Sequence, residues 1–376
     1  MQPLVQWDPD NPSQKERYYQ DLQEGYVQWQ SLPWTVQAGY NIQSWGDTDV
    51  FNPLDVVNAR RYYDPFRSEK MGAPTLLLKR EWERFFLEAL WIPMQRETVV
   101  PGDNSRWLPR ELYKSRTIDN SFGPSVLSLP SNIQYRYQQH ITQDNALKHN
   151  FGARLKFRFT GFDWTLAGFE GASVAPAVNI RSLRALTTVA FDAQTLQINV
   201  DPNTPITLRA IYYKTRMMGT SFVWVLGDYL VKGASAYTKV ISKLPNDQLP
   251  LDSHENALGL ERSFSLGSGT LTALAQGTYV NRKDKVDGNS VSLSRMFDKA
   301  AMVGLRWAPS EKITGTASFL YDIRYKGHFE HLDLGIKIAD GWNAKIAGDI
   351  MSGKPETPIG TYDRNDRVTV SLNLTK

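Results

Sequence analysis

The feature that most constrains this chain is an alternation of apolar and polar residues with a period of two, which recurs along most of its length. It is plain in residues 34–42, which read WTVQAGYNI, and again in residues 332–338, 342–350 and 368–374, which read LDLGIKI, WNAKIAGDI and VTVSLNL. Because successive side chains of a β-strand point to opposite faces, this pattern predicts strands with one apolar face and one polar face.

The length of these runs separates two classes of β protein. The runs extend over about nine to twelve residues, as in strands that cross a bilayer at a tilt, whereas strands of soluble proteins average about five or six. Several begin or end in Trp or Tyr, at Trp34, Trp45, Trp91, Trp164, Tyr279, Trp307, Tyr321 and Trp342, and aromatic girdles of this kind flank the apolar band of a membrane barrel. The sequence contains no run of about 18 apolar residues, so no membrane helix is predicted. A large soluble sandwich or lectin-like barrel with aromatic edges stays open as the alternative.

Connections of two lengths separate the runs. Tight-turn residues stand at 161, 309–312, 327 and 340–341, and longer polar segments occupy residues 46–74, 94–148, 172–204, 243–256, 281–297 and 352–366. Outer-membrane barrels alternate short periplasmic turns with longer extracellular loops in this way. We therefore predict an all-β fold, a transmembrane antiparallel β-barrel of about 16 strands in an up-and-down meander. The barrel is expected over residues 25–376, and residues 1–24 are expected to be a polar segment, either periplasmic or the start of a truncated strand.

A barrel of this size encloses an aqueous lumen, whereas an eight-stranded barrel is filled by side chains. Charged residues recur at alternate positions of several predicted strands, and successive charges are costly to bury in a dry core. Residues 60–61 are expected to line a solute path, with a solvated loop as the alternative. Segment 94–148 is the predicted constriction loop, with an extracellular loop as its alternative. The predicted pore-lining residues are Arg60, Arg61, Lys79, Glu81, Glu83, Arg154, Lys156, Arg158 and Arg209.

Composition excludes several kinds of site. The chain has no Cys, so disulfides and thiolate metal sites are excluded, and its net charge of +4 comes without a basic run of the kind that binds nucleic acid. Asp47, Asp49 and Asp55 are candidate calcium ligands, but turns also favour Asp for backbone reasons. His328 and His331 are three residues apart, which places them on opposite faces of a strand and argues against a shared metal ion. We predict no metal site and no cofactor.

The sequence also lacks the patterns of a catalytic site. It contains no GxSxG nucleophile motif and no GxxxxGK[ST] or GxGxxG phosphate-binding motif. Ser253, His254 and Glu255 are adjacent, but neighbouring residues of a strand face opposite ways. We predict that the protein is not an enzyme, and a membrane-embedded hydrolase is the least favoured alternative.

Several motifs lie in an order that identifies a resemblance. WGDTD at residues 45–49, NPLD at 52–55 and LWIP at 90–93 follow one another, and the hairpins GARLKFRFTGFDWTLAGFEG at 152–171 and LGDYLVKGASAYTKV at 226–240 come later. Together they resemble a family of proteobacterial porin-like outer-membrane β-barrels of uncharacterised function. The resemblance spans much of the chain. It implies the outer membrane of a Gram-negative bacterium, with outer-membrane lipid, lipopolysaccharide and the barrel-insertion machinery as partners.

The first residues carry no signal peptide, since QPLVQWDPDNPSQKERYYQ is polar and interrupted by proline. We therefore expect this sequence to be a fragment whose precursor begins further upstream. The predicted function is that of a porin-like channel for passive diffusion of small solutes through a charged aqueous lumen. The alternative is a non-transporting structural or assembly barrel whose lumen is plugged by its own loops.

Overall fold

A computed structural model describes residues 2–6, 19–62, 64–103, 105–108, 116–120, 123–128, 134–182, 186–192, 195–200, 204–242, 249–282, 297–354 and 357–374. Sixteen strands form one sheet. In the order in which they pair, they are β1 (Gln2–Gln6), β2 (Tyr19–Ser31), β3 (Trp34–Asn41), β6 (Ala73–Glu81), β7 (Phe85–Met94), β12 (Lys148–Phe159), β13 (Phe162–Ala172), β18 (Lys214–Leu226), β19 (Tyr229–Ile241), β20 (Ser253–Leu266), β21 (Gly269–Arg282), β22 (Lys299–Ser310), β23 (Ile313–Asp322), β24 (Gly327–Ala339), β25 (Trp342–Ser352) and β26 (Arg367–Leu374).

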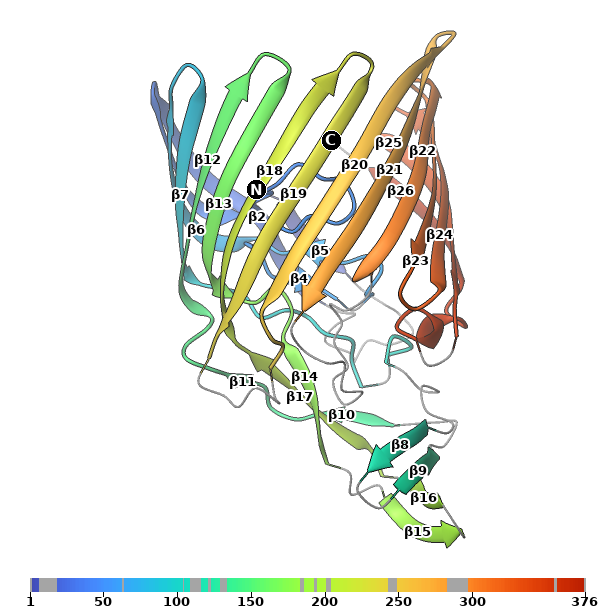
Figure 1. Ribbon diagram of the computed structural model, residues 1–376. Helices are drawn as coiled ribbons and strands as arrows, with labels where there is room; N and C mark the ends of the chain where they lie inside the picture. Colours follow the sequence, from blue (N-terminus) through green and yellow to red (C-terminus); the bar gives the residue numbers. More distant parts are fainter. Residues whose placement is uncertain are drawn as a thin grey trace.

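Every neighbouring pair in this sheet is antiparallel, and the strands follow one another in chain order. The prediction of an all-β antiparallel meander of this strand count is confirmed. The sheet curls into a barrel-shaped wall (Figure 1), and its described pairings run from β1 at one edge to β26 at the other. The described helical structure is one short turn, η1 (Gly360–Tyr362), and none of it is long and apolar enough to span a membrane.

The two ends of the wall differ in their connections. Tight hairpin turns join strands at one end, and longer connections and smaller sheets gather at the other (Figure 1). Gly161 and Gly341 stand in tight turns with φ of +73° and +78°, a conformation that glycine adopts without the steric cost that other residues bear. The predicted tight turns at these two positions are confirmed.

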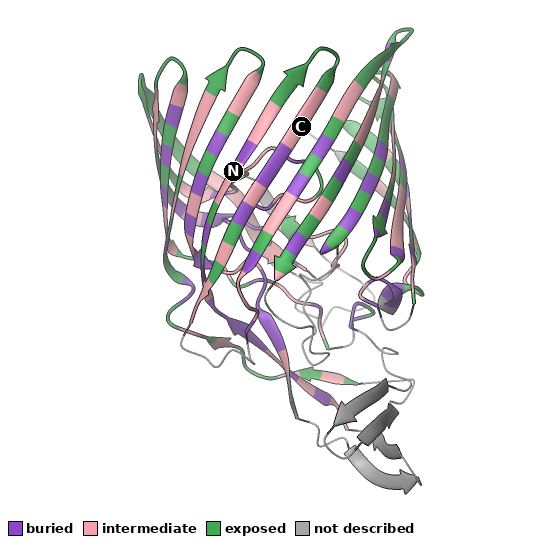
Figure 2. Cartoon of the chain, in the orientation of Figure 1, coloured by how far each residue is buried: buried purple, intermediate pink, exposed green. Residues whose placement is uncertain are grey.

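Alternate residues of the wall strands differ sharply in burial, which Figure 2 shows as bands of colour along each arrow. Asp349 of β25 is 1% exposed on the inner face, and its neighbour Ile350 is 49% exposed on the outer face. The inner face packs against chain segments inside the curl, whereas the outer face has no such cover. Large aliphatic side chains that remain exposed on the outer face include Leu76, Leu78, Leu87, Leu258, Val303, Leu305, Leu332, Ile346, Val368 and Val370.

Exposed aromatic side chains flank this aliphatic band at both ends. Those near the tight turns are Trp34, Trp82, Phe159, Trp224, Phe264, Trp307 and Trp342. Those near the long connections are Phe151, Tyr237, Tyr279 and Tyr321. The outer face thus carries an apolar belt between two aromatic rings.

Two smaller sheets lie beyond the long-connection end of the wall (Figure 1). In one, β17 (Ile206–Tyr212) pairs with β10 (Tyr135–Tyr137), β11 (Ile141–Thr142) and β14 (Ala177–Ser182). In the other, the order is β15 (Leu186–Asp192), β16 (Thr195–Val200), β9 (Gly123–Ser128) and β8 (Arg116–Asn120). A further pair, β4 (Arg60–Arg61) and β5 (Glu69–Lys70), belongs to the connection between β3 and β6.

These sheets correct two expectations. Arg209 lies on β17, outside the wall, because that alternating segment finds its partners in β10, β11 and β14. The described strands of segment 94–148 belong to the smaller sheets and not to a constriction inside the wall. The division into residues 1–24 and 25–376 stays a prediction; residues 19–24 belong to β2, which pairs with β1 in the large sheet.

Candidate functional site

The candidate site is the connection between β3 and β6, residues 42–72, which we call the internal loop. It runs inside the curled sheet, where Figure 1 shows β4 and β5 within the wall. Its side chains and backbone form polar contacts with β7, β12, β18, β19, β21, β25 and β26. A single connection therefore spans from one side of the wall to the other.

One half of the internal loop is anchored by an apolar cluster. Trp45, Leu54 and Val57 are each 0% exposed, and they pack with Leu90, Ile92, Phe169, Met217 and small residues of the inner face. The rings of Trp45 and Phe169 meet edge to face with centroids 6.4 Å apart. Burying side chains of this size contributes roughly 1.5–3 kcal/mol each, so this half of the loop is part of the protein's core.

A buried carboxylate holds the Trp45 indole. Trp45 Nε1 donates to Glu88 Oε1 of β7 at 3.1 Å, and Arg154 Nη2 of β12 donates to Glu88 Oε2 at 2.9 Å. Arg154 also donates to the Ser44 carbonyl oxygen at 3.2 Å. Glu88 is 4% exposed, and both its oxygens are satisfied, as a buried charge requires. The predicted residue Arg154 is thus tied to the loop and does not stand free in the lumen.

The acidic residues of the internal loop face basic residues of the wall. Asp47 accepts from Lys156 Nζ of β12 at 3.1 Å and from Ser221 Oγ of β18 at 2.7 Å. Asp49 lies 2.8 Å from Lys232 Nζ of β19, which also lies 2.8 Å from Glu261 of β20. These carboxylates have ammonium partners, and the ion pairs hold the loop to the wall.

Two side-chain amides also hold the loop through hydrogen bonds, one on the wall and one in the loop itself. Gln276 of β21 accepts from the Val50 N–H at 3.0 Å and donates to the Phe51 carbonyl at 2.8 Å. Asn58, which is 3% exposed, accepts from the Gln43 N–H and donates to the carbonyls of Asn41 and Met71. Asn58 therefore joins the two ends of the loop, where the chain leaves β3 and returns to β6.

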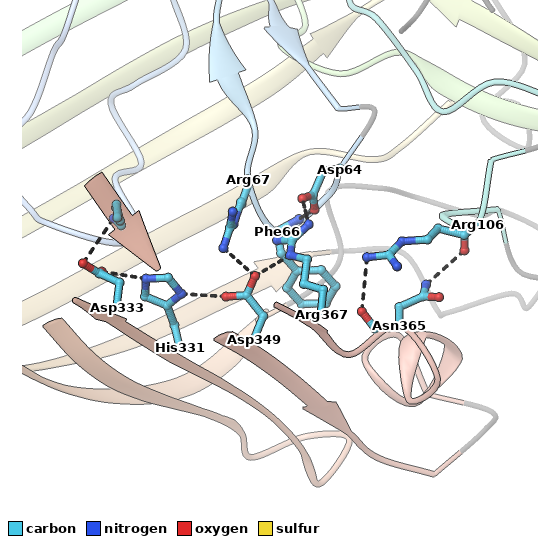
Figure 3. A network of polar contacts seen from close by, with 10 residues as sticks. Asp64, Phe66, Arg67, Arg106, His331, Asp333, Asp349, Asn365 and Arg367 are labelled. Atoms are coloured by element: carbon cyan, nitrogen blue, oxygen red, sulfur yellow. Dashed lines mark hydrogen bonds and ion pairs between the residues drawn. The ribbon is translucent and has the colours of Figure 1, made fainter. Parts of the chain in front are cut away.

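The other half of the loop meets β24, β25 and β26 in an ionic network (Figure 3). Arg67 Nη2 donates to Asp349 Oδ2 at 2.7 Å, and Arg367 bridges Asp349 to Asp64 of the loop. Asp349 is 1% exposed and Asp64 is 2% exposed. Asp349 pairs with two guanidinium groups, whereas Asp64 pairs with Arg367, so breaking the Arg367–Asp64 pair leaves a buried charge without its guanidinium partner.

His331 extends this network along the wall. Its Nδ1 lies 2.6 Å from Asp349 and its Nε2 lies 2.9 Å from Asp333, which also pairs with Lys345 at 3.2 Å (Figure 3). His328, three residues earlier, instead stacks on Phe319 of the neighbouring strand with centroids 5.5 Å apart. In the described residues no group of three or more His, Asp or Glu side chains is arranged to hold a metal ion.

An aromatic cluster lies beside this ionic network, near the long connections. Phe66 of the internal loop stacks on Phe329 of β24 with centroids 4.9 Å apart and planes 16° apart. Trp107 and Tyr362 pack against Phe66, and Arg106 and Asn365 exchange hydrogen bonds of 3.3 and 3.0 Å beside them. The connections therefore brace one another where the loop meets the wall.

The remaining predicted residues fall into three groups. Arg60 pairs with Asp55, and Arg61, which is 1% exposed, pairs with Glu69 at 2.9 Å, so both fold inside but bind within the loop. Lys79 and Glu81 pair on β6, and Arg158 lies over the ring of Phe86 with its Cζ 5.0 Å from the centroid. Glu83 lies in the turn between β6 and β7, off the wall face, because β6 ends at residue 81.

Sequence reasoning missed several residues that carry the site. The alternating pattern identified the inward positions of the strands but not their partners. The loop residues Asn58, Asp64 and Arg67 gave no periodic signal. Trp45 was expected to end the strand that begins at Trp34, but β3 ends at Asn41 and Trp45 is buried in the loop. One clue was available: WGDTD and NPLD concentrate an indole, acids and an Asn in a connection too long for a turn.

Comparisons with known proteins give the following. A scan of family models and a search of curated proteins returned no match. Similar solved structures include a triple mutant of the Rh. blastica porin, at 13% identity over 93% of this chain and 86% of that chain with a TM-score of 0.38. Wzi of Escherichia coli, described as an outer-membrane protein involved in group 1 capsule assembly and a carbohydrate-binding β-barrel, is similar at 8% identity over 94% and 69% with a TM-score of 0.48. Acinetobacter baumannii OccAB4 is similar at 9% identity over 93% and 75% with a TM-score of 0.45. These values are low, so the functional argument rests on the chain's own residues.

Proposed function

We propose that this chain forms an outer-membrane channel for small polar solutes, narrowed from within by the internal loop. The apolar belt between two aromatic rings supports the membrane location. Exposed aliphatic side chains over so many strands would be an aggregation liability in water, and in lipid they are the expected face of a barrel. Tight turns at one end and long connections at the other match the periplasmic and extracellular ends of such barrels.

The inner face supports passage of polar solutes. Toward the tight-turn end, beyond the internal loop, inward positions of the wall carry exposed polar groups: Arg306, Thr314, Asn343, Lys345 and Asn373. Side chains of this kind stay solvated in a water-filled space, and the charges lining a pore bias which solutes pass. Solute passage would therefore be decided where the internal loop crosses.

The observation that carries this proposal is the attachment of one loop to opposite parts of the wall. Asp47 binds β12 and Asp49 binds β19, whereas Asp64 binds β26 and Arg67 binds β25. A loop held at both sides narrows the interior at a fixed level. The wall cations Lys156 and Lys232 face loop carboxylates there, so solutes would meet both signs of charge.

The same attachments favour a second candidate, a non-transporting barrel plugged by its loop. Trp45, Leu54 and Val57 are fully buried, as in an ordinary core, and a loop held so firmly in the interior could close it. The two candidates share the membrane location, the fold and the loop. They differ only in whether water and solutes pass beside the loop.

Single-channel recording in a planar bilayer separates the candidates. We expect the refolded protein to conduct, and a variant in which residues 47–57 are replaced by a short Gly-Ser linker to conduct several times more. A silent protein with a conducting linker variant would overturn the channel and support the plug. If neither the protein nor the linker variant conducts, although heat-modifiable gel mobility shows that both are folded, the proposal of a pore is overturned. A protein that is monodisperse without detergent would overturn the membrane location itself.

Membrane partners follow from this proposal. Outer-membrane lipid would surround the apolar belt, and the barrel-insertion machinery would assemble the sheet. The solute is small and polar, and no contact in the described residues points to a nucleic acid. A hydrolase finds no support, since no described Ser, His and carboxylate form a hydrogen-bonded triad.

A further inference from the structure

A groove of about 460 Å³ crosses the outer face of β18, β19, β20, β21 and β22. Its lining falls into two rows whose members stand opposite one another on successive strands. The polar row, nearer the long connections, is Thr220, Ser235, Asn256, Tyr279 and Lys299. The apolar row, one step toward the middle of the wall, is Phe222, Gly233, Leu258, Gly277 and Ala301.

The apolar row forms the floor of the groove, and this floor contains a hollow. A Cβ added to Gly277 would meet no atom within 4 Å, whereas one on Gly233 would lie 2.3 Å from the Phe222 ring, which covers that position. Leu258 beside them is 60% exposed. The hollow therefore lies between Leu258 and Ala301, over Gly277, and its apolar sides suit an acyl chain.

The polar row lies at the edge of the apolar belt, level with Tyr279 of the aromatic ring near the long connections. Ser235 Oγ donates to Asn256 Oδ1 at 2.9 Å and lies 3.0 Å from His254 Nε2. Among the described residues nothing accepts a hydrogen bond from the Asn256 side-chain nitrogen. In lipid an amide donor without an acceptor costs several kcal/mol. An acceptor supplied by a bound molecule, such as the carbonyl of an acyl linkage, removes that cost.

Cations border the groove on the side of the long connections. Lys299 ends the polar row, and Lys239 stands opposite Arg216 further toward that end. Arg216 is already paired with Glu170 at 2.7 Å, whereas Lys239 and Lys299 have no ion-pair partner among the described residues. Basic residues at this depth attract the phosphates of lipid head groups.

We propose that this groove binds the lipid A portion of lipopolysaccharide, with an acyl chain over Gly277, an acyl-linkage carbonyl at Asn256 and a phosphate at Lys299. The inference rests on the proposed function, because the long connections must face the leaflet that holds this glycolipid. The length of the polar row favours lipid A over a phospholipid as the bound molecule. This row crosses four interstrand spacings, about 19 Å, which suits a phosphorylated disaccharide better than the single head group of a phospholipid.

Native mass spectrometry of the detergent-solubilised protein tests the proposal, with a lipopolysaccharide reduced to lipid A and its inner sugars as the probe. Gly277→Leu adds a side chain to the hollow, where a Cβ meets no atom within 4 Å, and is expected to abolish the adduct. Lys299→Ala is expected to weaken it about five-fold, from the attraction of one basic residue for an anionic head group. Gly348→Leu is the matched control for the first variant, because a Cβ there also meets nothing within 4 Å. Lys312→Ala, in the tight turn after β22, is the control for the second.

Equal loss of the adduct in Gly348→Leu or Lys312→Ala would overturn the proposal, since it would indicate general lipid coating. Equal binding of phosphatidylglycerol would overturn the choice of glycolipid. A second copy of this chain in place of the lipid adduct would also overturn it. Each variant is first shown to be folded by heat-modifiable mobility. Channel recording on the same samples reports on the proposed function separately, because the groove lies on the opposite face from the internal loop.

Discussion

Trp45 of the internal loop occupies the space that a side chain at position 152 would take. A Cβ built on Gly152 of β12 would lie 2.6 Å from Trp45 Cη2 and 3.1 Å from the Phe169 ring. A glycine in the middle of a wall strand weakens the strand itself, and here it gives the indole room to pack against the backbone. The wall and the loop are therefore fitted to each other at this point.

Gly152→Ala is expected to displace the internal loop. Overpacking of a fitted core costs about 1–3 kcal/mol, and the loop absorbs it more easily than the wall does. We expect a lower midpoint in heat-modifiability gels together with a larger and noisier single-channel current. Gly168→Ala on β13 is the control, because its nearest contact would be an ordinary 3.8 Å. Unchanged current in Gly152→Ala would show that the loop does not set conductance.

Glu88→Ala is expected to destabilise the fold by about 1–3 kcal/mol, since it leaves the buried Trp45 N–H without its acceptor and the partly buried Arg154 guanidinium without its carboxylate. Glu88→Gln keeps one acceptor for the indole and should lose less. Chemical unfolding in detergent, followed by Trp fluorescence, measures both. Equal losses in the two variants would contradict the role assigned to the Trp45 hydrogen bond.

Arg367→Leu is expected to release the far half of the internal loop. It removes the bridge between Asp349 and Asp64 and leaves Asp64 buried without its guanidinium partner, at a cost of about 3–5 kcal/mol. Hydrogen exchange should increase in residues 60–70 and stay unchanged in residues 45–58. Lys337→Ala cuts an exposed pair with Asp340 at the tight-turn end and should change neither. Uniform exchange through the whole loop would contradict a division into two separately anchored halves.

Stability is expected to fall at alkaline pH through two buried phenols outside the wall strands. Burial raises the pKa of Tyr212 and of Tyr362 above the ordinary value of about 10. A raised folded-state pKa gives stability that is complete below the unfolded-state value and is lost as the pH rises through the folded-state value. Near-UV absorbance should show these tyrosines ionising last. Tyr362→Phe should lessen the alkaline loss, whereas Tyr26→Phe, at a position 47% exposed, should leave it unchanged.

Leu332→Arg is expected to impair assembly in bilayers by about 2–4 kcal/mol, because it places a charge on the apolar belt. Ser371→Arg, on the inner face of β26, should assemble normally. Folding yield into lipid vesicles gives the comparison. Equal yields for the two variants would contradict the assignment of Leu332 to a lipid-facing row.

Strand positions could be read from the chain because the signal is local. WTVQAGYNI, LDLGIKI and VTVSLNL each carry the period of a strand within a few residues, and pairing in a meander needs only the next strand. The same local signal misplaced Arg209, since ITLRAIY alternates like a wall strand but pairs with β10, β11 and β14. Alternation identifies a strand without identifying the sheet to which it belongs.

The sequence alone determined an all-β chain, its tight turns and the inward faces of Arg154, Lys156 and Arg158. Tertiary structure alone decided that residues 42–72, and not the described strands of 94–148, cross the interior. The physical reason is distance along the chain: Asp64 meets Arg367 and Arg67 meets Asp349 across about three hundred positions. Such pairs leave no periodic trace and exist only once the sheet has curled and brought its far strands to the loop.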